Sequence, residues 1–395
     1  RSTLFPYTTL FRSLELQSPS YSSTPSRRDL LRLTGAGAGS AIALSLLAGC
    51  GSKSAGGSAG GSASATSGTQ TITDMTGTQV EVPIAPAAYA DGWYAHNEVI
   101  IMLAGAKGLK ATHCDPKKFP WMYKVCPNMS GAKSTFGDGF NLEELTTIDP
   151  APQVIFDSDD KLRDKATEVG IPVVACKFST YEEMKKSITM TSQVLGGDAT
   201  KIAERYNAEL GQVVKDVKAK TDGLSDDQRP TVMHGNSVYT LNLDGTGTII
   251  DEWIKTAGGR NAVTETTSSA NAQFTMEQIL AWDPDVIITG KAGEAEQILA
   301  DPNWASIKAV QNQKVYVNPK GVFGWDRYGV EAILQVQWAS ALLHPELFPD
   351  LKIETKLKEF YKNYLSYELT EAEVALIMAD RKSTRLNSSH LELSR

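Results

Sequence analysis

Two series of short apolar strands alternate with helices, and one long helical stretch separates the two series. In the first series, strands are expected at 153–156 and 173–175, with a polar helix at 161–169 between them. In the second series, the expected strands are 231–233, 286–288 and 315–317. This alternation is typical of parallel sheets covered by helices on both faces. The sequence therefore predicts an α/β fold of two βαβ lobes.

The stretch 198–222 is expected to form the single long spine helix that joins the two lobes. Asp198 stands where a helix N-cap is expected, and no glycine follows it until Gly211. The N-terminal lobe is predicted to span 71–197 and the C-terminal lobe 223–379. A hairpin of strands 71–75 and 79–82 begins the N-terminal lobe. In such folds the ligand cleft lies between the lobes, near the carboxyl ends of the strands.

The folded part is preceded by segments that read as an export signal and a tether. Residues 14–49 contain the twin arginines Arg27 and Arg28 and a short apolar run. The run closes with Leu47-Ala48-Gly49-Cys50, which matches the lipobox of bacterial lipoproteins and implies that Cys50 is lipidated. Residues 50–70 are almost entirely small and polar and predict a flexible linker. The expected location is extracytoplasmic, lipid-anchored to the outer face of the cytoplasmic membrane, at the cell surface or in the periplasm.

The two ends of the chain are interpreted as foreign to the protein. Residues 1–13 and 380–395 each resemble a translated sequencing adapter, and both are excluded from the fold prediction. Of the 39 basic and 46 acidic residues, these runs and the signal hold 9 and 4, which leaves 30 against 42. Such an acidic protein is a poor partner for nucleic acid, so the lipid on Cys50 rather than charge would hold it at the membrane.

Three cysteines remain once Cys50 is assigned to the lipid. Cys176 lies in an apolar strand and is expected to be buried. Cys114 and Cys126 are compatible with a disulfide in an exported protein, or with two free thiols. Direct metal binding by this pair is the weaker interpretation, because a structural zinc site needs a fourth ligand and closer cysteine pairs.

One pattern occurs in both predicted lobes. Glu143 lies in a short helix that leads to Asp149-Pro150 and a buried strand. Glu277 lies in a similar helix that leads to Asp283-Pro284 and another buried strand. The repetition indicates that the two lobes are built alike.

These features, in their order along the chain, resemble those of the iron-siderophore, haem and cobalamin class of periplasmic substrate-binding lipoproteins of ABC transporters. The resemblance covers nearly all of 71–378. Its further markers are 71–83, Gly258-Gly259-Arg260-Asn261-Ala262, Trp304, Lys314-Val315-Tyr316, 325–328, Glu331, Trp338 and 344–348. The resemblance implies that the chain delivers a small-molecule metal chelate to an ABC permease and its ATPase. It also implies that Glu143 and Glu277 dock onto permease arginines, although both also fit as ordinary first-turn glutamates.

Four loops hold the candidate ligand-binding residues. Aromatic side chains and a fixed arginine fork suit the rim of a metal chelate. The loop 323–328 is the preferred candidate. Five of the residues also have a structural interpretation: Trp93 and Trp325 as core, His96 as a cap of the next helix, His234 as a satisfied polar residue, and Arg327 as the partner of Asp326 in a pair that shapes the loop. The candidates are Trp93, Tyr94, His96, Trp121, Tyr123, His234, Trp325, Arg327 and Tyr328.

The sequence therefore predicts a receptor for a ferric chelate of the siderophore type. The alternatives within the same fold are haem, a corrinoid, or a nickel or cobalt chelate. Haem would require an axial ligand, for which Tyr94, His96 and His234 are candidates. No catalytic residue, resident cofactor or direct metal site is predicted, since no nucleophile elbow or HExxH pattern is present. An exported enzyme is the remote alternative.

Overall fold

The computed structural model describes residues 68–134, 142–267 and 272–378. The predictions on the terminal runs, the export signal, Cys50 and most of the linker lie outside the described residues. The last expected linker residues belong to a strand instead, because β1 (Thr69–Thr73) begins at Thr69. It pairs antiparallel with β2 (Gln79–Pro83), which confirms the predicted hairpin.

The first sheet is parallel and has the strand order β5-β4-β3-β6-β7. Its strands are β3 (Tyr89–Asp91), β4 (Leu109–Thr112), β5 (Lys133–Ser134), β6 (Ile155–Phe156) and β7 (Val173–Val174). The helices that accompany it are α1 (His96–Ala104), α2 (Pro120–Val125), α3 (Leu142–Thr146), α4 (Asp160–Glu168) and α5 (Tyr181–Leu195). A complete capping box of Thr180 and Glu183 fixes the start of α5 at Tyr181.

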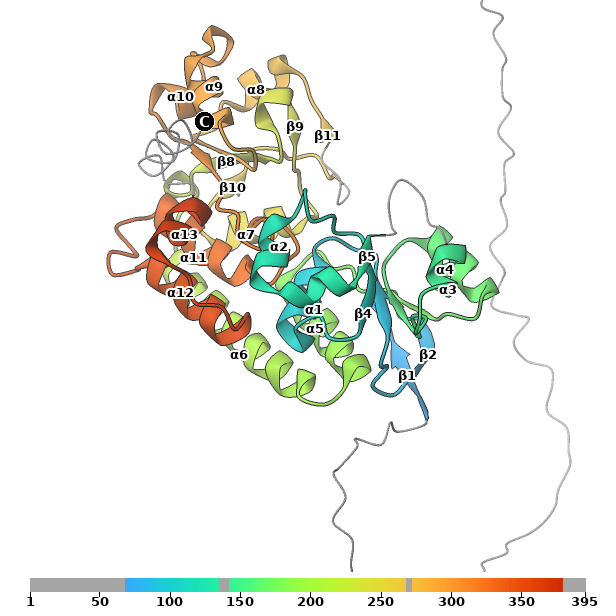
Figure 1. Ribbon diagram of the computed structural model, residues 1–395. Coiled ribbons are helices and arrows are strands. Elements are labelled where there is room, and N and C mark those ends of the chain that lie inside the picture. The colour runs from blue at the N-terminus through green and yellow to red at the C-terminus, as the bar shows by residue number, and fades with distance from the viewer. Residues whose placement is uncertain (1–67, 135–141, 268–271, 379–395) are drawn as a thin grey trace, which may run out of the picture. The chain divides into compact units, whose positions relative to one another are not determined.

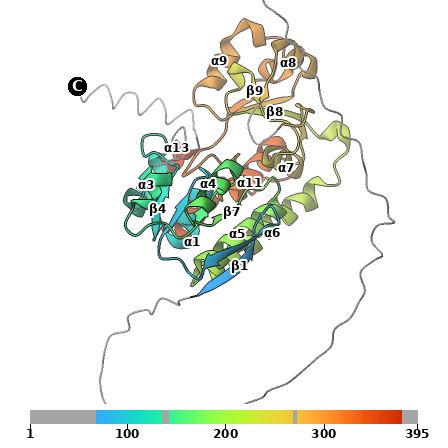
Figure 2. The same cartoon turned by 90° about the vertical axis from the view of Figure 1, so that its right-hand side faces the viewer.

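The spine helix is α6 (Ala199–Thr221). It packs against α1 and α5 on one side and against α7 (Ile249–Thr256) and α11 (Ala332–Leu343) on the other, as Figures 1 and 2 show. The expected cap does not form, because the Asp198 side chain makes no hydrogen bond to a backbone N–H of the first turn. Its carboxylate instead pairs with the ammonium of Lys201 at 3.3 Å. Tyr206 of α6 donates a hydrogen bond of 2.7 Å to the Val330 carbonyl, which ties the spine to the segment before α11.

The second sheet is also parallel and has the order β10-β8-β12-β13. Its strands are β8 (Thr231–Gly235), β10 (Arg260–Asn261), β12 (Val286–Thr289) and β13 (Val315–Val317). A small antiparallel pair, β9 (Asn242–Leu243) and β11 (Ala272–Gln273), lies beside it. The remaining helices are α8 (Met276–Trp282), α9 (Glu294–Ala300), α10 (Lys308–Gln311), α12 (Ile353–Tyr364) and α13 (Glu371–Ile377). The predicted α/β fold of two lobes joined by one long helix is confirmed.

The largest apolar core is continuous across the spine helix. It joins buried side chains of α1 and α5 to those of α7, α11 and α12 through Tyr206 and Leu210 of α6. Burial of this kind contributes about 25 cal/mol per Å² of apolar surface, so the spine stabilises both lobes at once. Within residues 68–134, 142–267 and 272–378, no helix combines the length and the apolar character needed to cross a bilayer.

Candidate ligand-binding site

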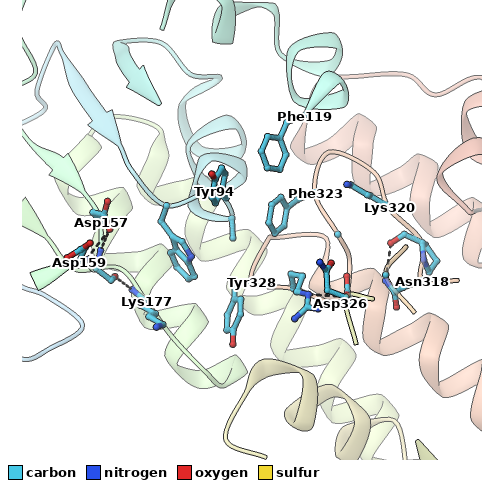
Figure 3. A pocket seen from close by; sticks show the side chains of 18 of the residues that line it. Tyr94, Phe119, Asp157, Asp159, Lys177, Asn318, Lys320, Phe323, Asp326 and Tyr328 are labelled. Carbon is cyan, nitrogen blue, oxygen red and sulfur yellow. Dashed lines mark hydrogen bonds and ion pairs between the residues drawn. The ribbon is translucent and has the colours of Figure 1, made fainter. Parts of the chain in front are cut away.

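A cavity of about 960 Å³ lies at the carboxyl ends of strands from both sheets (Figure 3). Loops after β3, β4, β6 and β7 form one wall, and loops after β8, β12 and β13 form the other. This is where ligands bind in parallel α/β folds. The described lining residues are Trp93, Tyr94, Ala95, Phe119, Asp157, Ser158, Asp159, Asp160, Lys161, Lys177, Asn236, Gly290, Asn318, Pro319, Lys320, Phe323, Gly324, Asp326, Arg327 and Tyr328.

Aromatic rings from both walls meet across the cavity. Trp93, after β3, lies 5.6 Å from Tyr328, after β13, between ring centroids. Phe119 and Phe323 stack at 5.9 Å with an interplanar angle of 17°. Tyr94 lies between Phe119, at 5.2 Å, and the imidazole of His113, at 3.9 Å. The lining therefore offers several π faces to a large ligand while its ring contacts connect the two halves of the fold.

A closed ring of four charged side chains lies at the base of the second wall. His234 contacts Asp244 through Nδ1 at 2.9 Å and Asp326 through Nε2 at 3.0 Å. Arg327 contacts the same two carboxylates, Asp244 at 2.8 Å through Nη1 and Asp326 at 3.2 Å through Nε. Trp253 packs edge-on against the imidazole and donates its indole N–H to the Asp326 carbonyl at 3.3 Å. The ring fixes Arg327 at the cavity surface.

The ionised forms of this ring stabilise one another. Burial alone would raise the pKa of Asp244 and of Asp326, but Arg327 and His234 outweigh burial and lower both pKa values. Burial alone would lower the pKa of His234, but its hydrogen bond to Asp244 and its close contact with the Asp326 carboxylate raise that pKa above the ordinary value. The ring therefore favours two negative and two positive charges, a balanced set of the kind that buried charges require.

Asp157 is the buried carboxylate of the opposite wall, directly after β6. Its Oδ1 accepts hydrogen bonds from the backbone N–H groups of Ser158, at 2.5 Å, and Asp159, at 3.1 Å. Burial raises the pKa of Asp157 to about 6, although these two bonds oppose the shift. The nearby carboxylates of Asp91 and Asp159 raise it further.

Four of the predicted ligand-binding residues line the cavity, namely Trp93, Tyr94, Arg327 and Tyr328. Three others are corrected, because the structure buries them completely. His96 bridges Asp91, at 2.8 Å, and Thr191, at 2.9 Å, inside the first lobe. His234 belongs to the charged ring behind the cavity surface. Trp325 donates its indole N–H to Glu331 at 3.0 Å and packs in the core.

The loop 113–126 contributes Phe119 but not the two aromatics predicted from it. Trp121 and Tyr123 lie on α2 outside the cavity lining. The ammonium of Lys124 lies 4.7 Å from the centre of the Trp121 ring, and Tyr123 donates to the Cys114 carbonyl at 2.6 Å.

Cys114 and Cys126 are free thiols, so the disulfide alternative is not adopted. Cys176 is buried, as predicted. Among the described residues, no group of three or more His, Cys, Asp or Glu side chains is arranged to hold a metal ion.

The predictions missed the polar residues that follow the strands, namely Asp157, Lys177, Asn236 and Asn318. Each stands within three residues of the carboxyl end of a sheet strand: β6, β7, β8 and β13 respectively. A polar residue just after an apolar strand was therefore the signal that could have identified them.

The cavity loop 318–328 is held from behind by Glu331. This buried carboxylate accepts hydrogen bonds from the Phe323 N–H at 2.9 Å, the Trp325 indole at 3.0 Å and the Tyr361 hydroxyl at 2.8 Å. A Cβ at Gly321 would overlap with the Glu331 carboxylate, so glycine is required for this close approach. These bonds fix the loop that carries Phe323 and Arg327 before any ligand arrives.

Glu143 and Glu277 are both exposed, in the first turns of α3 and α8. The Thr275 side chain caps α8, and the backbone N–H of Glu277 and the Thr275 hydroxyl lower the pKa of Glu277. Their exposure fits docking, and their place in the first turn fits the helix-dipole alternative as well.

A cavity between two α/β lobes that are joined by one long helix defines the class of solute-binding proteins with a single-helix connection. A family model described as "Periplasmic binding protein" matches residues 127–321, which is 195 of the 395 residues. The chain is the substrate-binding component of an ABC transporter and functions outside the cytoplasm.

Two curated proteins are similar in sequence. The molybdate-binding protein MolA of Haemophilus influenzae is 27% identical over 57% of this chain and 69% of its own length. The ABC transporter substrate-binding lipoprotein YvrC of Bacillus subtilis is 24% identical over 78% of this chain and 96% of its own length. These relatives are binding proteins of transporters and not enzymes.

Solved structures share the fold. A periplasmic solute binding protein from Veillonella parvula is 26% identical, with a TM-score of 0.68 over 80% of this chain and 100% of that one. Molybdate-bound MolA is 20% identical, with a TM-score of 0.68 over 76% and 99%. Helicobacter pylori CeuE in a nickel–histidine complex is 18% identical, with a TM-score of 0.64 over 79% and 99%.

Proposed function

We propose that the protein captures a ferric chelate of the siderophore type and delivers it to an ABC permease. The observation that carries the proposal is the cavity of about 960 Å³ whose rings come from both lobes. Cavities of this size hold organic molecules and bury most of their surface. Trp93, Phe119 and Phe323 offer stacking area for a chelator, while Asn236 and Asn318 offer amides to its oxygen atoms.

Molybdate is the second candidate, because MolA is a molybdate-binding protein. A bare tetrahedral oxyanion would fill only a small part of this cavity, and it has no use for stacked aromatic rings. Oxyanion sites instead depend on donors that converge on one point. The width and the aromatic lining of the cavity therefore favour an organic chelate.

Haem is supported less than a siderophore. Two of its candidate axial ligands, His96 and His234, are fully buried. The imidazole of each already contacts a carboxylate, that of Asp91 or of Asp244 respectively. Only Tyr94 reaches the cavity. Of the three predicted axial ligands, a haem iron could thus reach one, and that ring is stacked against His113. Tyr328 is a second tyrosine on the described lining, and its ring packs against Trp93 and Phe178.

Ligand binding is expected to quench the fluorescence of Trp93, since this indole lines the cavity. Residues 68–378 would be titrated with ferric siderophores, haem, cobalamin, nickel–histidine and molybdate. We expect saturable quenching by a ferric siderophore, lost in Trp93→Phe and retained in Trp121→Phe, whose indole lies outside the lining. Quenching by molybdate or haem alone would overturn the proposal.

Alanine at Glu143 and Glu277 is expected to weaken docking onto the permease without changing ligand affinity. Two exposed carboxylates that fix register on a basic socket affect association with the partner, and their combined loss should cost about 10-fold or more in transport. The measurement is uptake of the labelled chelate with the cognate permease and ATPase. Glu144→Ala with Glu354→Ala provides a matched control, since these are also first-turn glutamates. Equal transport by both double variants would contradict docking through Glu143 and Glu277.

A further inference from the structure

The charge of the cavity differs between its rim and its interior. Among the described lining residues, four side chains are acidic and four are basic. The three lysines, Lys161, Lys177 and Lys320, are exposed to solvent, whereas Asp157 and Asp326 are only 8% and 3% exposed. Water screens the lysines much more than the buried carboxylates. The electrostatic effect of the two buried carboxylates on a ligand deep in the cavity is therefore screened less than the effect of the lysines.

Arg327 is the partly buried cation of the described lining, and its charge is already compensated. Its guanidinium forms ion pairs with Asp244 and Asp326, and the imidazole of His234 completes the ring with the same carboxylates. The four charges sum to zero when His234 is protonated. Arg327 can thus orient a neutral oxygen acceptor, but the ring provides no surplus positive charge to balance an anion.

The opposite wall adds negative charge. Asp157 is held by backbone N–H groups and not by a cation within ion-pair distance among the described residues. The charged groups that act on it most strongly are the carboxylates of Asp91 and Asp159. A negatively charged ligand would have to approach this carboxylate with no adjacent buried cation to compensate the repulsion.

We propose that the cavity selects a ferric chelate of little or no net charge, of the trihydroxamate kind, and rejects a trianionic tricatecholate. The inference rests on the proposed function and deepens it. Three hydroxamates cancel the charge of ferric iron, whereas three catecholates leave a large negative charge on the complex. Like charges brought together in a desolvated site are strongly unfavourable, so charge is the property that separates these two ligand classes here.

The test compares the neutral ferric trihydroxamate ferrichrome with ferric enterobactin, a trianionic ferric tricatecholate, by quenching of Trp93 at neutral pH. Ferrichrome is expected to bind at least about 100-fold more tightly. Higher salt should not restore binding of the tricatecholate, because salt screens the exposed lysines more than the buried carboxylates. Tricatecholate binding as tight as that of ferrichrome would overturn the inference and leave the proposed function standing. If neither chelate binds, the proposed function fails, and the inference fails with it.

Asp157→Asn tests the mechanism of selection. It removes the buried charge and keeps an oxygen that accepts the two backbone N–H groups, so the affinity ratio of the two chelates should narrow about 10-fold. Asp164→Asn is the matched control, since Asp164 is exposed on α4 and does not line the cavity. The comparison uses the ratio of the affinities for the two chelates, and a general loss of folded protein would affect both affinities equally. A ratio that is unchanged in Asp157→Asn, or changed equally in the control, would overturn the role of Asp157.

Discussion

Replacing Arg327 with alanine is expected to abolish measurable ligand binding and to lower the free energy of unfolding by about 3–5 kcal/mol. Arg327 connects two buried carboxylates, Asp244 and Asp326, and its loss leaves them with His234 as their only remaining cation in the ring. Removing one partner of a buried ion pair costs much more than the pair itself contributes, because the abandoned charge stays desolvated. The measurement combines urea denaturation with fluorescence titration of the same preparation.

The double variant Arg327→Leu with Asp244→Asn separates the two effects. It leaves Asp326 and His234 as a balanced pair, so most of the lost unfolding free energy should return. Ligand binding should stay impaired, since the guanidinium at the cavity surface is still absent. Recovery of binding together with stability would contradict a direct role for Arg327 and would leave it as a purely structural residue.

Local patterns were enough to predict the fold. The helix at Tyr181–Leu195 shows how local such signals are, because its capping box and its apolar periodicity both lie within a few residues of one another. The parallel strands β12 and β13 are short apolar runs between turn residues. The cap at Asp198 failed because Asp198 is itself helical in backbone conformation and cannot place its carboxylate on the first turn.

The site was predicted only in part, because its contacts join residues far apart in the chain. Arg327 was expected to direct its donor fork at the ligand, but Asp244, 83 positions earlier, binds it. His96 was treated as a loop residue, whereas Thr191 of α5, 95 positions later, binds its Nε2. Nothing local in the sequence indicates such partners. The aromatic residues Trp93 and Tyr328 were identified because their position after a strand is a local property.

A second pair of buried carboxylates connects the first lobe to the cavity loop. Glu98 of α1 is fully buried beside Glu331, and a Cβ at Gly329 would overlap with its carboxylate. Burial raises the pKa of Glu98 well above its ordinary value, and the neighbouring Glu331 raises it further. Burial also raises the pKa of Glu331 to about 7, although the Phe323 N–H opposes the shift. The folded protein therefore favours a proton on this pair.

The sign of the resulting pH dependence follows from the raised pKa values. The folded state binds protons on the pair more tightly than the unfolded state, where each carboxyl has its ordinary pKa of 4.5. The stability that the pair contributes is complete below that ordinary value and is lost as the pH rises to about 7. For Glu331 alone, a pKa of about 7 corresponds to a loss of about 3 kcal/mol over that range.

Glu98→Gln is therefore expected to stabilise the protein at alkaline pH, near pH ~8, with little effect near pH ~5. Glutamine has nearly the same shape and supplies permanent amide hydrogens in place of the proton that Glu98 must otherwise retain. The measurement is the free energy of unfolding by urea across this pH range. Glu204→Gln is the control, because it makes the same chemical change at a solvent-exposed position of α6. It should leave the free energy of unfolding unchanged at both pH values. If Glu98→Gln destabilises the protein equally at both pH values, Glu98 functions as an ionised acceptor, and the pair holds no shared proton.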